Sequence, residues 1–318
     1  MELGAHLPLI EFGGEGQSLT RIRGAAEAAR DCGFAAVSAN DHFIFSTPWL
    51  DGPTALAAVI EHTAPLELAT TVSLAALRGP VPLAKSLAAI DLLSGGRLVA
   101  GVGPGSSERG YDAVGIAFED RWARFEEAVA LLRALLAGEP ANPGERFAVP
   151  DQSLAPAPVR PGGVPIWIGS WGSAAGLRRV ARLGDGWLAS AYNTTPGRFA
   201  QARARLAEAL QGQGRSSDHF PNGLATMWTW ITEDRAGAER MLRGVLAPLL
   251  GRDPDQLARQ VCIGGRGHCL ELLGRFAEAG CDRVYLWPLG DEPRQLEIAG
   301  EELLPHLIAA RSSRLEPS

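Results

Sequence analysis

Residues 66–105 read LELATTVSLAALRGPVPLAKSLAAIDLLSGGRLVAGVGPG, and this stretch decides the fold class. The apolar run at 66–74 predicts a buried strand, and the segment that starts after Pro82 predicts a helix. The turn Ser94–Gly96 ends that helix, and a second apolar run follows at 98–102. A strand, a helix and a strand in this order are typical of parallel strands that are covered by helices.

The same alternation continues along the chain and predicts eight strands, each followed by a helix. The expected strands cover residues 3–7, 34–39, 66–74, 98–102, 165–169, 186–190, 224–231 and 283–287. Eight such units in 318 residues favour a single (β/α)8 TIM barrel of the α/β class. A doubly wound open sheet is the alternative. It is disfavoured because the loop Gly101–Glu108 does not fit the G-x-G-x-x-G pattern.

We predict one domain over residues 1–318, with irregular insertions near 138–164 and 252–265. The first insertion holds six of the 22 prolines and has little periodicity. Both segments are longer than most connections, so we expect them to form a lid over the substrate. Among the helices, we expect one at 53–62 and a continuous one at 234–250.

The composition favours a cytoplasmic enzyme without a nucleic-acid or membrane partner. The net charge is −6, whereas nucleic-acid-binding domains usually carry a basic stripe. No signal peptide precedes the first strand, and no apolar stretch reaches about 18 residues. The four cysteines form no C-x-x-C pair, and no H-E-x-x-H, H-x-H or carboxylate cluster appears. We therefore expect reduced thiols in the core and no metal site.

Polar and aromatic residues follow the expected strands, at the ends where barrels carry their active sites. In chain order these residues are His6 and Glu11; Asn40, Asp41 and His42; Thr71, Val72 and Ser73; Gly103, Pro104, Gly105 and Ser106; Gly169, Ser170, Trp171 and Gly172; Ser190 and Tyr192; Trp228 and Trp230; and Trp287. Most tryptophans lie in or beside strands and are expected in the core. Trp49 lies in a polar loop instead, and we expect it to form a pocket wall.

The segment Gly169–Ser173 has the features of a phosphate site. Its glycines allow backbone N–H groups to approach a ligand, and the helix that follows adds the positive end of its dipole. An ordinary N-cap at Ser173 is the alternative interpretation. A second glycine-rich loop after the fourth strand favours the phosphate site.

The pair Asp41–His42 follows the second strand, where an apolar run ends. A neighbouring carboxylate would favour the imidazolium form and fix the tautomer of the ring. Such a histidine suits a general acid, a general base or a group that polarises a flavin-like ring. A packed histidine that is hydrogen-bonded to Asp41 is the alternative.

The chain resembles the luciferase-like monooxygenase superfamily, and within it the deazaflavin (coenzyme F-420)-dependent oxidoreductases. The resemblance covers nearly the whole chain. It is carried by SANDHF at 38–43, by the quoted stretch 66–105, by VPIWIGSWGSAAGLRRVARLGDGW at 164–187 and by AGCDRVYLWP at 279–288. The resemblance implies an eightfold barrel with the cofactor across the carboxyl ends of the strands, and a homodimer.

The resemblance also implies roles for residues of this chain. The cofactor ring would lie near Asp41, Thr71, Val72, Ser73, Gly103, Pro104, Gly105 and Ser106, with a non-proline cis peptide around Val72–Ser73. The phosphate tail would lie at Gly169, Ser170, Trp171 and Gly172. His42, Asp41 and Trp49 would be catalytic, and His6, Glu11, Trp230 and Trp287 would contact the substrate.

The leading hypothesis is therefore an F-420-dependent oxidoreductase that transfers a hydride to or from a small organic substrate. An FMN-dependent monooxygenase that uses reduced flavin and oxygen is the alternative, and a non-catalytic flavin-binding barrel is the third hypothesis. The sugar-phosphate dehydrogenases of this branch have a glutamate directly after the fourth-strand glycine loop. This chain has Ser106 there, with Glu108 two residues later, and it has no cluster of basic residues for a second phosphate. Both departures argue against a sugar-phosphate substrate.

Overall fold

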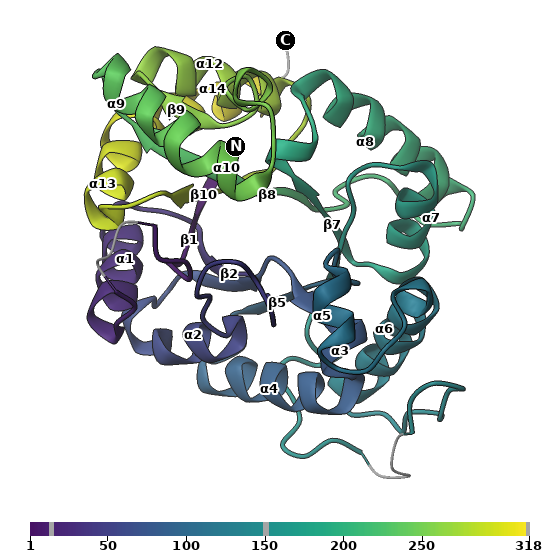
Figure 1. Cartoon of the computed structure of the whole chain (residues 1–318). Coiled ribbons are helices and arrows are strands. Elements are labelled where there is room, and N and C mark those ends of the chain that lie inside the picture. The colour runs from purple at the N-terminus through teal and green to yellow at the C-terminus, as the bar shows by residue number, and fades with distance from the viewer. Residues whose placement is uncertain (13–15, 149–152, 316–318) are drawn as a thin grey trace.

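A computed structural model describes residues 1–12, 16–148 and 153–315 of the chain. Eight parallel strands close into a barrel, because the last strand pairs with the first as well as with its predecessor. The barrel strands are β1 (Glu2–His6), β2 (Ala36–Ala39), β3 (Glu67–Thr70), β5 (Leu98–Gly103), β6 (Ile166–Gly169), β7 (Gly186–Ser190), β8 (Asn222–Ile231) and β10 (Arg283–Pro288). The predicted TIM barrel is confirmed (Figure 1).

Helices surround the barrel and cover the outer face of its strands (Figure 1). The longer ones are α1 (Leu19–Asp31), α4 (Pro80–Leu93), α6 (Arg121–Ala137), α7 (Ala174–Leu183), α8 (Pro196–Gln211), α12 (Arg266–Glu278), α13 (Glu292–Glu302) and α14 (Leu304–Leu315). Ser18 caps helix α1, because its hydroxyl accepts the N–H of Arg21. Among the described residues, no helix is both long enough and apolar enough to cross a membrane.

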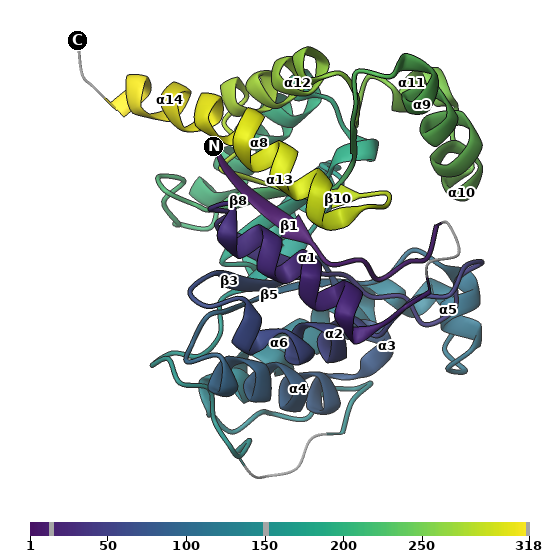
Figure 2. The same ribbon diagram turned by 90° about the vertical axis from the view of Figure 1, so that its left-hand side faces the viewer.

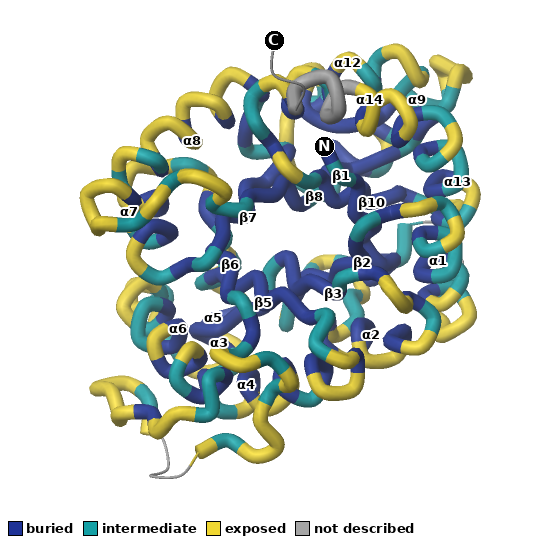
Figure 3. The backbone as a smooth tube through the Cα atoms, turned by 180° about the vertical axis from the view of Figure 1, so that it is seen from behind, coloured by how far each residue is buried: buried dark blue, intermediate teal, exposed yellow. Residues whose placement is uncertain are grey.

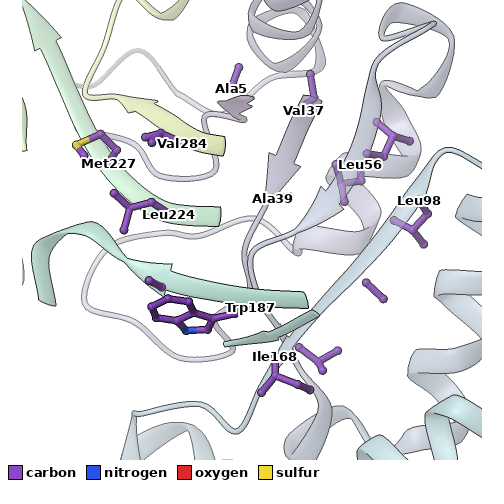
Figure 4. Packing of buried hydrophobic residues seen from close by; sticks show 14 of the residues in the cluster. Ala5, Val37, Ala39, Leu56, Leu98, Ile168, Trp187, Leu224, Met227 and Val284 are labelled. Carbon is purple, nitrogen blue, oxygen red and sulfur yellow. The ribbon is translucent and has the colours of Figure 1, made fainter. Parts of the chain in front are cut away.

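The main core lies between the strands and the helices. Figure 3 shows the strands buried and the outer faces of the helices exposed. Figure 4 shows side chains of neighbouring strands in this core, among them Val37, Ile168 and Leu224, each at most 1% exposed. Burial of such continuous apolar faces is the main term that stabilises the barrel.

A smaller cluster fills the inside of the barrel, and its largest rings are Trp167 and Tyr285. Glycines on neighbouring strands leave room for both rings. A Cβ atom on Gly186 would lie 2.6 Å from the Trp167 ring, and one on Gly4 would lie 2.5 Å from the Tyr285 ring. The inside of the barrel is therefore packed, as is usual for this fold.

Three predicted elements differ from the structure. The strand expected at 66–74 is divided into β3 and β4 (Ser73–Leu74). The helix expected at 53–62 is α2 (Gly52–Ala58), followed by the 3-10 turn η1 (Ile60–His62). The helix expected at 234–250 is α9 (Arg235–Glu239), a π-helix η4 (Arg240–Leu246) and α10 (Ala247–Leu250).

The two insertions lie in different places. The described part of 138–164 packs on the outside of α4 and α6: Lys85 donates to the Ala155 carbonyl, and Asp91 accepts the Val159 N–H. A lid formed by this segment over the strand ends is therefore wrong, and residues 149–152 lie outside the described residues. The segment 252–265 is not irregular, because it contains α11 (Pro254–Leu257) and β9 (Cys262–Gly264). Figure 2 shows α10 and α11 at the same end of the barrel as α5 (Glu108–Asp112).

Candidate active site

The carboxylate of Asp41 is the centre of a buried ion pair at the end of β2. It accepts two N–H groups of the Arg78 guanidinium, at 2.5 and 2.7 Å, and the backbone N–H of Leu74 at 3.3 Å. The Asp41 side chain is only 1% exposed. Asp41 makes no hydrogen bond to His42 among the described contacts, so the alternative of a histidine hydrogen-bonded to Asp41 is wrong. The carboxylate instead fixes the loop after β2 to the end of β4.

Arg78 is a residue that the sequence reasoning missed. It ends the short helix α3 (Ala75–Arg78), and it also binds the carboxylate of Asp51, which caps α2. Burial alone would lower the pKa of Arg78, but the hydrogen bonds and charges of Asp41 and Asp51 raise it above its ordinary value. One partly buried cation on α3 therefore binds both ends of the connection between β2 and α2.

His42 and Trp49 come together, as predicted. Their ring centroids are 4.2 Å apart, and the Phe45 ring lies 5.0 Å from that of His42. Burial lowers the pKa of His42 to about 4, although the charge of Asp41 acts in the opposite direction. His42 is therefore a neutral imidazole at pH 7, not the imidazolium that its sequence neighbour suggested.

His6 and Trp287, both expected to contact the substrate, are buried side chains that support the site. Their rings stack at 3.6 Å, and Trp287 stacks in turn on Trp228 at 4.0 Å. His6 lies 2.7 Å from the Leu7 carbonyl through Nδ1, and its Nε2 accepts the Asn40 N–H at 3.1 Å. These contacts place the proton on Nδ1, and burial lowers the pKa of His6 to about 3. Trp287 packs against the edge of Trp49, so this stack backs the wall beside His42.

The other two residues assigned to the substrate are more accessible. Trp230 and Glu11 are both half-buried, at the end of β8 and in the segment after β1. Trp230 packs with Trp228 and Trp287 in an apolar cluster with the segment from η4 to α11. That cluster places this segment beside the strand ends, on the side opposite to the loop after β2 in Figure 1.

The interruption between β3 and β4 is a non-proline cis peptide between Thr71 and Val72. It lies one bond before the position expected around Val72–Ser73. Val72 is half-buried, and its side chain reaches the ends of two further strands. A Cβ atom would lie 2.7 Å from Val72 if added to Gly103, and 3.1 Å from it if added to Gly169. The two glycine loops are therefore shaped to receive Val72, and the three segments meet at one point.

The loop after β6 is open on the side where α7 begins. Ser173 caps α7 by accepting the N–H of Gly176, and the Ser170 hydroxyl accepts the N–H of Gly172 at 3.3 Å. Gly172 has a φ of +89°, a conformation that favours glycine, and Trp171 is 59% exposed. The predicted cap and the predicted anion site are therefore compatible, because the cap leaves other N–H groups of the first turn available.

The loop after β5, with Gly103, Pro104, Gly105 and Ser106, is fixed by the helix that follows. Ser107 caps α5, and the hydroxyl of Tyr111 donates to the Pro104 carbonyl. Gly105 has a φ of +85°. The sequence reasoning missed Tyr111, whose pKa burial raises to about 12, so that it remains a neutral donor.

Buried polar atoms without a partner gather at these strand ends. Within the described residues, the oxygens Asn40 Oδ1, Thr71 Oγ1 and Ser73 Oγ have no hydrogen-bond partner. The indole nitrogens of Trp49, Trp228 and Trp287 share this property. A buried polar group without a partner costs about 1–3 kcal/mol, so such a cluster indicates a place where a ligand supplies the partners. A planar, polar heterocycle beside Val72 fits this set.

A second polar cluster joins the end of β7 to the middle of β8, and the sequence did not reveal its member Thr226. Thr226 has a φ of +58°, where β8 is bulged against β10, and its hydroxyl lies 2.9 Å from that of Ser190. Asn193 donates to Ser190 at 3.1 Å, and Arg252 donates to Asn193 at 3.0 Å. A β-branched residue in this conformation is an outlier of the kind that occurs at functional sites.

Comparison with known proteins places this geometry in a family. The family model described as luciferase-like monooxygenase matches residues 5–280. The chain is 29% identical to the F420-dependent glucose-6-phosphate dehydrogenase of Nocardia farcinica, over 97% of this chain and 98% of that protein. It is 32% identical to the 5,10-methylenetetrahydromethanopterin reductase of Archaeoglobus fulgidus, but that match covers 55% of this chain and only 51% of the reductase.

Solved structures share the fold at lower identity. Monooxygenase RslO1 from Streptomyces bottropensis superposes with a TM-score of 0.83 at 21% identity, covering 96% of this chain and 99% of that one. An F420-dependent secondary alcohol dehydrogenase superposes with a TM-score of 0.82 at 18% identity, covering 96% and 98% of the two chains.

Proposed function

The chain belongs to the luciferase-like monooxygenase family and is an oxidoreductase, and we propose that it transfers a hydride between coenzyme F-420 and a small organic substrate. The observation that carries this proposal is the meeting of Val72 with Gly103 and Gly169, surrounded by buried polar atoms without partners. A curated relative that is named for F420 dependence matches 97% of the chain and supports the choice of cofactor.

The residues present fit such a cofactor. Thr71, Val72 and Ser73 would hold the ring together with the loop Gly103–Ser106, and the loop Gly169–Gly172 would hold the phosphate at the start of α7. When bound, a deazaflavin supplies a hydride donor or acceptor. Arg78 holds the two loops on either side of the ring site, through Asp41 on one side and as the end of α3 on the other.

His42 would move the proton that accompanies the hydride. As a neutral imidazole it accepts a proton from a substrate hydroxyl, and in the reverse direction its protonated form returns the proton to a carbonyl oxygen. Trp49 and Phe45 pack against the ring and against each other, with their own centroids 4.7 Å apart, so they would hold the imidazole from one side. Proton transfer by a positioned group typically accelerates a reaction by about 10²–10⁴-fold.

An FMN-dependent monooxygenase remains the second candidate. Its flavin also ends in a phosphate, so the loop Gly169–Gly172 suits either cofactor, and solved monooxygenases share the fold. A titration of the purified protein with deazaflavin and with FMN separates the two. Trp171 is exposed within the phosphate loop and would report binding through its fluorescence.

We expect saturable quenching by the deazaflavin and weaker binding of FMN. The variant Trp171→Phe should lose most of this signal, whereas Trp122→Phe on α6 should keep it. Tight binding of FMN without any response to the deazaflavin would replace the proposal by the monooxygenase. Binding of neither cofactor would favour a non-catalytic barrel.

The role of His42 is tested by His42→Ala, for which we expect turnover to fall roughly 100-fold or more with unchanged cofactor affinity. The control is His62→Ala, because His62 is paired with Glu27 on an outer helix. The pH profile gives a second readout. Oxidation needs the neutral imidazole, so the rate should fall as the pH drops through about 4 and should show no step near 6.5. Normal turnover of His42→Ala would remove His42 from the mechanism.

A further inference from the structure

The rim of the barrel contains no basic residue in the segments that connect a strand to the next α-helix. These segments are residues 7–18, 40–51, 71–74, 104–107, 170–173, 191–195, 232–234 and 289–291. They contain acidic residues, among them Glu11, Asp51 and Asp291. The chain has 30 basic residues, so their absence from all eight segments characterises this end of the barrel.

Two arginines near the rim, Arg78 and Arg252, are already engaged. The Arg78 guanidinium binds the carboxylates of Asp41 and Asp51. Arg252 donates to Asn193 and lies over the ring of Tyr192, at 5.9 Å from its centroid. Within the connecting segments, the backbone N–H groups after β6 are therefore the candidate anion site, and in the proposed function the cofactor phosphate occupies them.

Aromatic side chains, and not basic ones, lie at this end of the barrel. Half-buried rings follow four of the strands: Phe12 after β1, Phe45 and Trp49 after β2, Tyr192 after β7 and Trp230 at the end of β8. Behind them lie the buried Trp228 and Trp287. Half-buried rings at a ligand site favour apolar groups, and they give no stabilisation to a phosphate or a carboxylate.

We propose that the substrate is an uncharged, apolar alcohol or the matching carbonyl compound, and that a phosphorylated sugar is excluded. This inference rests on the proposed function and concerns the substrate side of the same site. In these segments a phosphate ester would meet carboxylates and no lysine or arginine, and like charges at a site cost several kcal/mol. An apolar alcohol would instead bury its chain against the aromatic rings and present its hydroxyl to His42.

The chemistry balances with the groups present. On oxidation, the C–H bond of the alcohol carbon breaks, and its electron pair leaves with the hydrogen as a hydride to the deazaflavin. The O–H bond breaks as well, its proton goes to the neutral imidazole of His42, and a C=O bond forms. The substrate loses two electrons and the hydride carrier gains them, so no oxygen or metal is needed.

The test compares cyclohexanol and 2-heptanol with glucose 6-phosphate, using the full chain loaded with the deazaflavin. We expect saturable oxidation of both alcohols and none of the sugar phosphate. Binding of cyclohexanone to the loaded protein, followed by tryptophan fluorescence, gives a readout that does not depend on turnover. Oxidation of glucose 6-phosphate alone, or the absence of cyclohexanone binding, would overturn the inference while the proposed cofactor stands. Failure to bind the deazaflavin would instead overturn the proposed function.

Two variants test whether the aromatic rings of Trp49 and Phe45 bind the alcohol. Trp49→Gln and Phe45→Ala should each raise the KM for cyclohexanol by about 10-fold, with unchanged affinity for the deazaflavin. The control is Trp122→Gln, because Trp122 is an exposed residue of α6 that packs against Arg179. An unchanged KM in both ring variants would contradict the inference.

Discussion

At the scale of the residue, Asp41 shows that adjacency in the sequence does not decide which side chains form a pair. His42 is the next residue, yet Asp41 binds Arg78, which is 37 residues away in the chain. This pairing affects the environment of His42. The Asp41 carboxylate binds the Arg78 guanidinium, and the His42 imidazole contacts the aromatic rings of Phe45 and Trp49 instead. Burial then lowers the pKa of His42 to about 4 and keeps the imidazole neutral at pH 7.

The ion pair itself gives a prediction at this scale. Arg78→Met leaves the Asp41 carboxylate buried without its cation, and we expect a loss of about 3–5 kcal/mol in the free energy of unfolding. The double variant Arg78→Met/Asp41→Asn should recover part of this loss, because it removes the unpaired charge. Urea denaturation measures both.

A matched control for that experiment is Arg294→Met, whose partner Glu297 forms an exposed pair on α13. It should change the free energy of unfolding by about 1 kcal/mol or less. Equal effects of Arg78→Met and Arg294→Met would contradict a special role of the Asp41–Arg78 pair.

At the scale of the element, the third strand is where the structure and the prediction differ in a way that concerns the proposed site. Its apolar run was predicted as one strand over 66–74, and its ends are correct to within a residue or two. The structure divides it at the cis peptide between Thr71 and Val72, so that Val72 leaves the sheet and packs against Gly103 and Gly169. Three loops become one surface only through this interruption.

Gly103→Ala tests that surface. The added Cβ atom would lie 2.7 Å from Val72, so Val72 must move away from the place proposed for the ring. Overpacking of this kind costs about 1–3 kcal/mol, and we expect the dissociation constant for the deazaflavin to rise by about 10-fold. The control is Gly274→Ala in α12, where a Cβ atom meets no other atom within 4 Å. Unchanged cofactor affinity in Gly103→Ala would separate Val72 from the binding site.

At the scale of the whole molecule, barrel closure and barrel filling depend on each other. The strands close because β10 pairs with both β1 and β8, and the enclosed space is filled by Trp167, Tyr285 and smaller side chains. The glycines on β1 and β7 keep that space wide enough for the two rings. A homodimer, expected from the resemblance, stays a prediction.

Gly186→Ala is the corresponding prediction for the whole barrel. Its Cβ atom would lie 2.6 Å from the ring of Trp167, which is 7% exposed and has little room to move. We expect the free energy of unfolding to fall by about 1–3 kcal/mol, measured by chemical denaturation. Gly274→Ala is again the comparison, and it should be neutral or stabilising by up to about 1 kcal/mol because alanine favours helices. A Gly186→Ala protein as stable as Gly274→Ala would show that the interior is loosely packed.

The sequence by itself determined the order of strands and helices, the closed barrel and the loops that carry the site, because apolar periodicity, caps and glycine turns are local properties of the chain. His42, Trp49 and the loop Gly169–Gly172 were expected at the site from such local patterns and from the family resemblance, and their roles stay predictions. Only the tertiary structure decided which side chains pair: Arg78 with Asp41, Val72 with the two glycine loops, and Thr226 with Ser190. It also placed the segment 138–164 on the outer wall, against α4 and α6. Such choices depend on distances between residues that lie far apart in the chain, and those distances exist only once the barrel has closed.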